Sequence, residues 1–519
     1  MMVSYSFLAP GVLMAMAFIA WHQPGRRPGG PSKLSEYAAV AALGLAVLGV
    51  AQFAAAGPAT LSVLEGSAAL TFKAGLVNVT LALLVAFIGW VVIRYSRTFL
   101  YGEAREGRFL ALMLITLAAV LLFVQSGSMA ALIASSALVG LGLRRLLLFY
   151  STRPEARRAA TKFALVWHGA DAVLVIAALL LAARYGTGDF AAIVVASADA
   201  DLTLAASVAI ALIVFAATLK TAAFPLHGWL TEVMEAPTPV SALLHAGIIN
   251  SGGVLLIALA GLVQQSPGAM AALVMIGGFT ALFGAAVMLT QSAVKTSLAW
   301  STVSQMGFLL LQCGFGLWAL ALLHIVAHSL YKAHAFLSSG GAVRAVASLR
   351  RPGPIAVPSI GAVLKSFTLA LALYLVISTI FTALSGPKTA QALALGTILI
   401  LGVAYLVAQG LADLAPAELT KRTALASLGA AVAYFAFQAA AQAIWGPSLP
   451  PAPMPGPLEW ALLVLTVVSF GLVAFAQALF PLWAHHPSTA GLRVHLANGF
   501  YLNALLDRAI GGFLSAKTN

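Results

Sequence analysis

Residues 219–247 read LKTAAFPLHGWLTEVMEAPTPVSALLHAG, which places a lysine and a proline inside an otherwise apolar stretch. Lys220 lies near the end of the apolar run 203–223, and Pro225 follows it closely. Proline removes a backbone hydrogen bond and kinks or breaks a helix. In a bilayer, a broken helix is tolerated where its freed backbone groups face other protein or a water-filled cavity. The stretch therefore predicts a polar site within a bundle of membrane helices.

The composition of the whole chain agrees with a membrane protein. Of its 519 residues, 61% are hydrophobic and 8% are charged, whereas soluble domains carry about 25% charged residues. So few charges cannot cover the surface of a soluble protein, which excludes an ordinary cytosolic enzyme, a disordered chain and a nucleic-acid-binding protein. The single cysteine, Cys313, excludes a disulfide framework and a thiolate metal cluster within the chain. We expect no metal and no cofactor.

The apolar runs predict an all-α polytopic membrane protein with about fifteen transmembrane helices, since a spanning helix needs about 20 apolar residues. The runs lie near residues 5–21, 36–56, 74–93, 108–124, 127–149, 162–184, 203–223, 238–263, 268–291, 295–315, 317–340, 357–384, 390–412, 423–444 and 458–482. Most of the 28 lysines and arginines fall in alternate loops between these runs. By the positive-inside rule, this distribution predicts an outer N-terminus and a cytoplasmic C-terminus. The net charge of +13 is thus mostly a topology signal, aided by contact with anionic membrane lipid.

Three lysines remain inside the apolar runs: Lys220, Lys332 and Lys365. An ionisable side chain in a span costs about 3 kcal/mol, so it is a functional candidate by default. Lys365 lies close enough to the cytoplasmic end of its run to extend toward the headgroups, which leaves a structural explanation open for it. His245 adds a titratable group about two turns into the eighth run.

The eleventh run contains LHIVAHSLYKAHAF, in which His324, His328 and Lys332 recur at every fourth position. Residues at this spacing lie on one face of a helix, whereas His334 falls on another face. Such a stripe, with water between its members, predicts a proton wire; the alternative for each histidine is a hydrogen-bonded core residue. A metal site is disfavoured because the stripe has no carboxylate or thiolate ligand and its lysine repels the ion.

Asp171 is the one carboxylate clearly inside an apolar run, and His168 precedes it by about one turn. An ion pair or a helix-end contact near the cytoplasmic face is the structural alternative for Asp171. The further candidates for an ion pathway are titratable residues near these positions: His227, Glu232, Glu235, Lys295, His334 and Lys365.

The stretch at 219–247 resembles the proton-translocating antiporter-like subunits of respiratory complex I and of multi-subunit sodium/proton antiporters. So do VKTSLAWSTVSQMGF at 294–308 and LHIVAHSLYKAHAFLSSGG at 323–341. The resemblance covers roughly 108–345, less than half of the chain. It implies a fold of two inverted five-helix repeats with broken helices. It also implies a hydrophilic axis made by Lys220, His245, His324, His328 and Lys332.

The expected organisation follows from this resemblance. It divides the chain into N-terminal transmembrane helices at 1–107, a first repeat at 108–263, a second repeat at 264–412, C-terminal transmembrane helices at 413–482, and a cytoplasmic tail with an amphipathic helix at 483–519. The expected location is a bacterial inner membrane, with a periplasmic N-terminus.

The chain departs from this family in its fifth span. Complex I subunits carry a glutamate there that pairs with the lysine of the seventh span, whereas Ser135, Ser136 and Ala137 stand at that position here. Asp171 matches an aspartate in the sixth span of the family, so we predict that it is the acid that pairs with Lys220. The missing glutamate also leaves open a membrane anchor that no longer conducts ions.

The end of the chain, RVHLANGFYLNALLDRAIG at 493–511, resembles a narrower branch, the membrane subunits of two-component inorganic-carbon accumulation complexes. This resemblance implies a large cytoplasmic zinc-containing partner similar to a β-carbonic anhydrase, in which ion flow drives CO₂ hydration to bicarbonate. We predict that Phe500, Tyr501 and Leu505 dock this partner; the alternative is a helix that closes the bundle on its inner side.

The alternative function is that of a subunit of complex I or of a sodium/proton antiporter. The residues do not decide whether the transported ion is H⁺ or Na⁺. In each case the chain is expected to be a transport subunit and not itself an enzyme.

Overall fold

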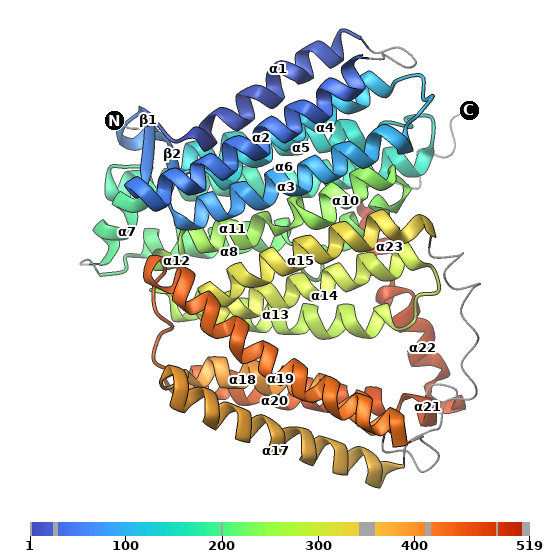
Figure 1. Ribbon diagram of the computed structural model, residues 1–519. Coiled ribbons are helices and arrows are strands. Elements are labelled where there is room, and N and C mark those ends of the chain that lie inside the picture. Colours follow the sequence, from blue (N-terminus) through green and yellow to red (C-terminus); the bar gives the residue numbers. More distant parts are fainter. Residues whose placement is uncertain are drawn as a thin grey trace.

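The structure is a computed structural model, and it describes residues 3–23, 30–198, 201–341, 359–410, 417–483 and 486–510. Within these ranges, 11 helices are long and apolar enough to cross a membrane, and three shorter apolar helices accompany them. The helices run side by side, and the two ends of the chain lie at opposite ends of the bundle (Figure 1). The predicted all-α polytopic class is confirmed.

The N-terminal part of the bundle contains three helices and a small sheet. The helices are α1 (Ala9–Trp21), α2 (Gly30–Ala56) and α3 (Leu76–Phe99), and a 3-10 turn at Tyr5–Leu8 precedes them. Strands β1 (Ala59–Leu64) and β2 (Leu70–Ala74) pair antiparallel, with Leu61 opposite Phe72. The sequence predicted helices alone, but the segment ATLSVL alternates apolar and polar residues, as a strand does.

The middle of the chain forms helices α4 to α15. The first group is α4 (Glu106–Val124), α5 (Met129–Leu147), α6 (Pro154–Tyr185), α7 (Phe190–Ala198), α8 (Leu204–Lys220), α9 (Gly228–Thr231), α10 (Thr238–Ala246), α11 (Ser251–Ala258) and α12 (Ala260–Val263). The second group is α13 (Pro267–Met288), α14 (Val294–Gly314) and α15 (Trp318–Ser338). Ser128 and Ser266 cap the starts of α5 and α13, where each hydroxyl accepts a backbone hydrogen bond at 3.3 Å.

Helices α13 and α14 pack closely because glycines lie between them. A Cβ atom on Gly277 would lie 2.5 Å from the backbone nitrogen of Leu311, and one on Gly307 would lie 2.4 Å from that of Ala281. In a membrane, small residues of this kind drive helix association, since lipid tails are as apolar as the helices. This close contact sets the position of α14 against α13.

Two spans are broken inside the bundle. Helix α8 ends at Lys220, and the chain passes through Ala222, at a positive φ of 51°, and Pro225 before it reaches α9 and the 3-10 turn Glu232–Glu235. The next span changes from α10 to α11 through a 3-10 turn at Ile248–Asn250. The predicted break after Lys220 is therefore present, and the second break was not predicted. Both place irregular backbone inside protein, where it is tolerated.

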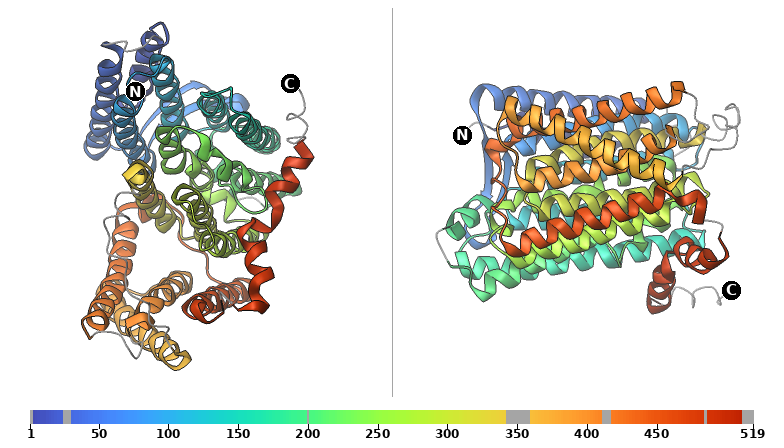
Figure 2. Two further views of the ribbon diagram at one scale, coloured as in Figure 1. Left: turned by 90° about the vertical axis from the view of Figure 1, so that its right-hand side faces the viewer. Right: turned by 90° about the horizontal axis from the view of Figure 1, so that it is seen from below.

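The C-terminal helices gather at one side of the bundle (Figure 2). They are α17 (Ile360–Ser385), α18 (Ala390–Gly410), α19 (Ala417–Trp445), α20 (Pro457–Ala478) and the short α21 (Phe480–Trp483). Tyr374 and Phe435 belong to a hydrophobic cluster of these helices alone. The tail forms α22 (Ala490–Ala497) and α23 (Leu502–Ile510), which lie across the end of the bundle opposite the hairpin (Figures 1 and 2).

Candidate functional site

Lys220 is fully buried at the end of α8, and its ammonium group has two polar partners. Its Nζ donates to a carboxylate oxygen of Asp171 on α6 at 2.7 Å and to the hydroxyl of Ser136 on α5 at 2.6 Å. The Ser136 hydroxyl donates in turn to the same carboxylate oxygen at 2.6 Å. The Nζ atom also lies 4.0 Å from the centre of the Trp167 ring. Three helices therefore meet at one buried ion pair, which we call the lysine cluster.

The lysine cluster pairs two opposite charges, and burial of either charge without the other would be unfavourable. A buried ion needs both an opposite charge and further hydrogen bonds to offset its loss of hydration. The second oxygen of Asp171 lies 3.2 Å from Nδ1 of His168, so both oxygens have a partner. The sequence named Asp171 as the acid for Lys220, and the structure brings the two together. The sequence did not identify Ser136 as a hydrogen-bond partner of Lys220, although that residue stands where the family glutamate would be.

A second polar cluster surrounds His328 on α15, and we call it the histidine cluster. Nδ1 of His328 lies 2.8 Å from Oε1 of Gln305, and its Nε2 lies 3.1 Å from the backbone carbonyl oxygen of His245. Nδ1 of His245 lies 3.0 Å from the Thr302 hydroxyl, and its ring stacks on Phe336. Nε2 of His245 is buried and finds no hydrogen-bond partner within the described part of the chain. The second helix break thus faces the predicted stripe.

The other members of the stripe extend the histidine cluster in both directions along α15. Lys332 is fully buried and donates to the Ser301 hydroxyl. Nδ1 of His324 lies 2.8 Å from Oε1 of Gln312, and the centres of the His324 and His328 rings are 5.9 Å apart. The structure therefore brings all three residues of the predicted stripe into one polar row.

Sequence reasoning missed the residues of α14 that face this row. They are polar and uncharged, and they are Ser301, Thr302, Gln305 and Gln312. Gln305 follows Ser301 by four positions, which is the spacing of neighbours on one helix face. That spacing was the available signal. Because these groups are neutral, they orient the imidazole rings without adding a charge to the membrane interior.

A third cluster lies at the end of the bundle that carries the tail. Lys162 on α6 has 1% of its side chain exposed, and its Nζ lies 2.6 Å from a carboxylate oxygen of Glu232 and 2.5 Å from one of Asp507. It also donates to the side-chain oxygen of Asn503 at 2.7 Å. Lys162 lies about two turns into α6, which begins at Pro154, and it is buried at the end of the bundle that carries the tail.

Replacement of Lys162 by methionine is expected to loosen α23 from the bundle. The change leaves two carboxylates beside each other without their shared cation, and breaking a buried ion pair in this way costs about 3–5 kcal/mol. Limited proteolysis of the purified chain should show faster cleavage of the tail. Lys295→Met is the control. It also removes a lysine side chain, but that side chain donates to the Thr238 hydroxyl at the start of α10, at 3.2 Å. Equal protection of the tail in both variants would contradict the expectation.

The remaining predicted residues lie around these clusters. His227 is buried against the rings of Phe283 and Trp300. His334 and Lys365 are exposed, on α15 and α17 respectively. The side chain of Glu235 lies outside the described residues.

The tail segment 499–510, which consists of a 3-10 turn at Gly499–Tyr501 and α23, presents two different sides. Asn503 and Asp507 on α23 contact Lys162, whereas Phe500 and Tyr501 in the turn and Leu505 on the helix have 44%, 42% and 59% of their surface exposed. The polar face closes the bundle, which was the alternative interpretation of this segment. On the apolar side, Phe500 lies against the Phe283 ring, with 6.1 Å between the ring centres, and part of its surface is exposed.

Comparison with known proteins places these clusters in a wider context. Residues 126–351 match a family model described as NADH:quinone oxidoreductase/Mrp antiporter, transmembrane. The chain is 36% identical to the probable inorganic carbon transporter subunit DabB2 of Halothiobacillus neapolitanus, over 98% of this chain and 93% of that protein. It is 45% identical to the probable inorganic carbon transporter subunit DabB of Hydrogenovibrio crunogenus, over 50% of this chain and 51% of that one.

A solved structure has a similar fold. It is the Mrp complex of Dietzia sp. DQ12-45-1b, one chain of which matches with a TM-score of 0.66 and 23% identity. The match covers 99% of this chain and 60% of that chain. At this identity the likeness shows the fold alone.

Proposed function

Because the chain belongs to the family of the probable inorganic carbon transporter subunits DabB, we propose that it is the cation-translocating membrane subunit of a two-component inorganic-carbon accumulation complex. The cation in this proposal is H⁺. The observation that carries it is the buried Lys220–Asp171 pair bridged by Ser136. We place the protein in a bacterial inner membrane, with its N-terminus in the periplasm and its C-terminus in the cytoplasm.

In this proposal the lysine cluster takes up and releases a proton. Asp171 faces Lys220 with one oxygen and His168 with the other, so loss of a proton from the lysine changes the charge that the carboxylate must balance. A buried carboxylate without a cation is unfavourable, so departure of this proton is coupled to arrival of another at the cluster. Ser136 can pass a proton between the two groups, because a hydroxyl both donates and accepts.

The histidine cluster can hold a second proton. Both ring nitrogens of His328 face oxygen atoms, one on Gln305 and one on the backbone of His245. A protonated imidazole donates from both nitrogens and suits this environment, whereas a neutral one needs a donor at Nδ1. Rotation of the Gln305 amide exchanges its oxygen for its NH₂ group and supplies that donor. The same ring is therefore accommodated with or without the proton.

The partner in this proposal is a large cytoplasmic zinc-containing subunit similar to a carbonic anhydrase, in which ion flow drives the hydration of CO₂ to bicarbonate. The two-faced tail helix supports a partner on this side. Its polar face contacts Glu232, which follows Lys220 in the helix break, through Asn503. A protein bound to Tyr501 and Leu505 would thus contact a tail segment that is attached, through Asn503, to the segment that follows Lys220.

Replacement of Leu505 by aspartate is expected to release the partner while the membrane part still inserts. Apolar side chains at the centre of an interface carry most of its binding energy, and a buried unpaired carboxylate opposes binding. Leu492→Asp is the matched control, since Leu492 is a leucine of α22 with 48% of its surface exposed. Co-purification of the tagged chain with the co-expressed partner measures the effect. An unchanged yield for Leu505→Asp would place the docking surface elsewhere.

The alternative function is a subunit of complex I or of a multi-subunit sodium/proton antiporter, which the family match at residues 126–351 favours. The two functions differ in what assembles with the chain. Expression of the chain with the zinc-protein partner, in cells that lack their own complex, should restore growth at ambient CO₂. Failure to do so, with co-purification of quinone-reductase or antiporter subunits instead, would favour the alternative.

A further inference from the structure

The end of the bundle that carries the β hairpin contains a large vestibule. Its volume is about 710 Å³, and its walls include parts of α3, α5, α7 and α11. Lys73, Asn78 and Ser126 contribute polar groups to its lining. In the orientation proposed above, this vestibule faces the periplasm. Neither the lysine cluster nor the histidine cluster lines it.

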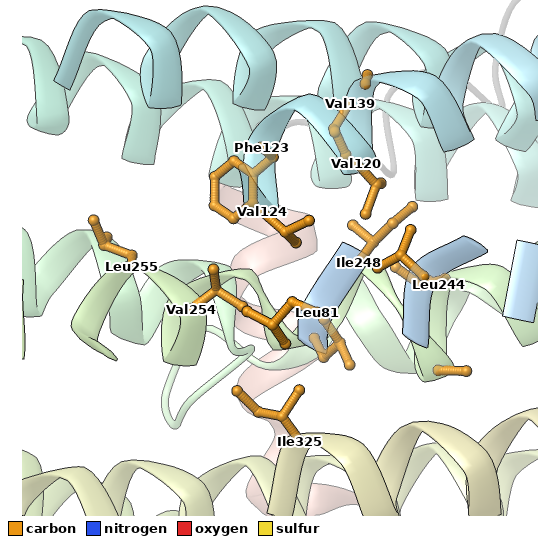
Figure 3. Packing of buried hydrophobic residues seen from close by; sticks show 14 of the residues in the cluster. Leu81, Val120, Phe123, Val124, Val139, Leu244, Ile248, Val254, Leu255 and Ile325 are labelled. Atoms are coloured by element: carbon orange, nitrogen blue, oxygen red, sulfur yellow. The ribbon is translucent and has the colours of Figure 1, made fainter. Parts of the chain in front are cut away.

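A second, much smaller cavity adjoins the vestibule on the inner side. Its volume is about 20 Å³, which is room for a single water molecule. Leu81, Phe123, Val124 and Val254 line both spaces, so these four side chains form the wall between them. They are buried and come from three helices, and Figure 3 shows how they gather. We call these four side chains the outer gate.

The small cavity leads to the histidine cluster through Asn250. This residue lies at the second helix break and lines the cavity together with Ser329. Its Nδ2 donates to the Ser329 hydroxyl at 3.0 Å, and Ser329 follows His328 directly on α15. The Oδ1 atom of Asn250 is buried and has no hydrogen-bond partner among the residues that the structure describes. Buried polar atoms are usually hydrogen-bonded, so we expect a water molecule in the small cavity to donate to this amide oxygen.

We propose that the outer gate is a hydrophobic barrier between the vestibule and the histidine cluster, and that Asn250 and Ser329 receive water and its proton on the inner side. The proposal rests on the ion-translocating function proposed above. A narrow apolar constriction without water stops ions and protons, and the same constriction conducts when it fills with water. The closed wall seen here isolates the cluster from one side of the membrane, as a transporter that alternates between two sides requires.

Cysteine accessibility tests this proposal in the full-length chain expressed with its partner. The natural Cys313 is fully buried, so it gives little background. The probe is a charged, membrane-impermeant methanethiosulfonate added to intact cells. Lys73 lines the vestibule with an exposed side chain, so Lys73→Cys should react fast, whereas Ser251 is buried and lines the small cavity, so Ser251→Cys should react slowly.

Val254→Thr makes one gate residue polar at constant shape and should wet the gate. We expect it to speed the reaction of Ser251→Cys by at least about tenfold, equivalent to about 1.4 kcal/mol. Val139→Thr is the matched control, because Val139 is buried in the same hydrophobic cluster (Figure 3) but lines neither space. A slow Lys73→Cys, a fast Ser251→Cys in the otherwise native chain, or no effect of Val254→Thr would each overturn the proposal. Labelling does not depend on carbon uptake, so these results are separable from a failure of the proposed function.

Discussion

Replacement of Lys220 by methionine is expected to abolish inorganic-carbon accumulation while the chain still inserts and assembles. Methionine keeps much of the volume of the lysine side chain but has no group that takes up a proton. The change removes the ammonium group that lies 2.7 Å from Asp171 and 2.6 Å from Ser136. The lysine cluster then loses its one lysine, and proton transfer through it should stop completely.

Bicarbonate uptake and growth at ambient CO₂ measure this effect, in cells that lack their own complex and at matched amounts of membrane protein. The control is Lys365→Met, because Lys365 is a lysine of another span that is exposed on α17. It should accumulate carbon as the unchanged chain does. Normal uptake by the Lys220→Met chain would show that the lysine cluster is not required for ion movement.

The second large effect is expected at Asp171, and it tests the pairing of the two charges. Asp171→Asn alone leaves Lys220 fully buried without its carboxylate, which should lower the free energy of unfolding by about 3–5 kcal/mol. Adding Lys220→Met removes the stranded charge. The double variant should therefore regain stability relative to Asp171→Asn, although its transport stays absent.

Thermal unfolding of the purified variants measures the coupling between the two residues. For residues in direct contact, the effect of the double change differs from the sum of the single effects, whereas distant residues give additive effects. Asp507→Asn combined with Lys220→Met is the matched comparison, since Asp507 is bound to Lys162 in the third cluster. Additive losses for Asp171→Asn and Lys220→Met would show that the two side chains act separately.

The sequence by itself determined the class of the protein and most of its polar candidates. With 61% hydrophobic residues arranged in runs of about 20, the chain forms a bundle of membrane helices, in which each backbone group is bonded within its own segment. An ionisable residue is expensive in such a bundle, so Lys220, Asp171 and the stripe from His324 to Lys332 stand out against their apolar neighbours. Pro225 indicated the first break, because proline disrupts a helix and this one stands just after an apolar run.

Apart from Asp171 as the acid for Lys220, the partners of these residues were decided by the tertiary structure. Ser136 reaches Lys220 across 84 positions of sequence, and Lys162 reaches Asn503 in the tail across 341. The outer gate likewise combines side chains from three helices. Each of these side chains is apolar, like its neighbours in the sequence. Sequence periodicity shows which residues share a face of one helix. Which face meets which depends on the rotation and depth of each helix in the bundle, and close packing between helices sets both.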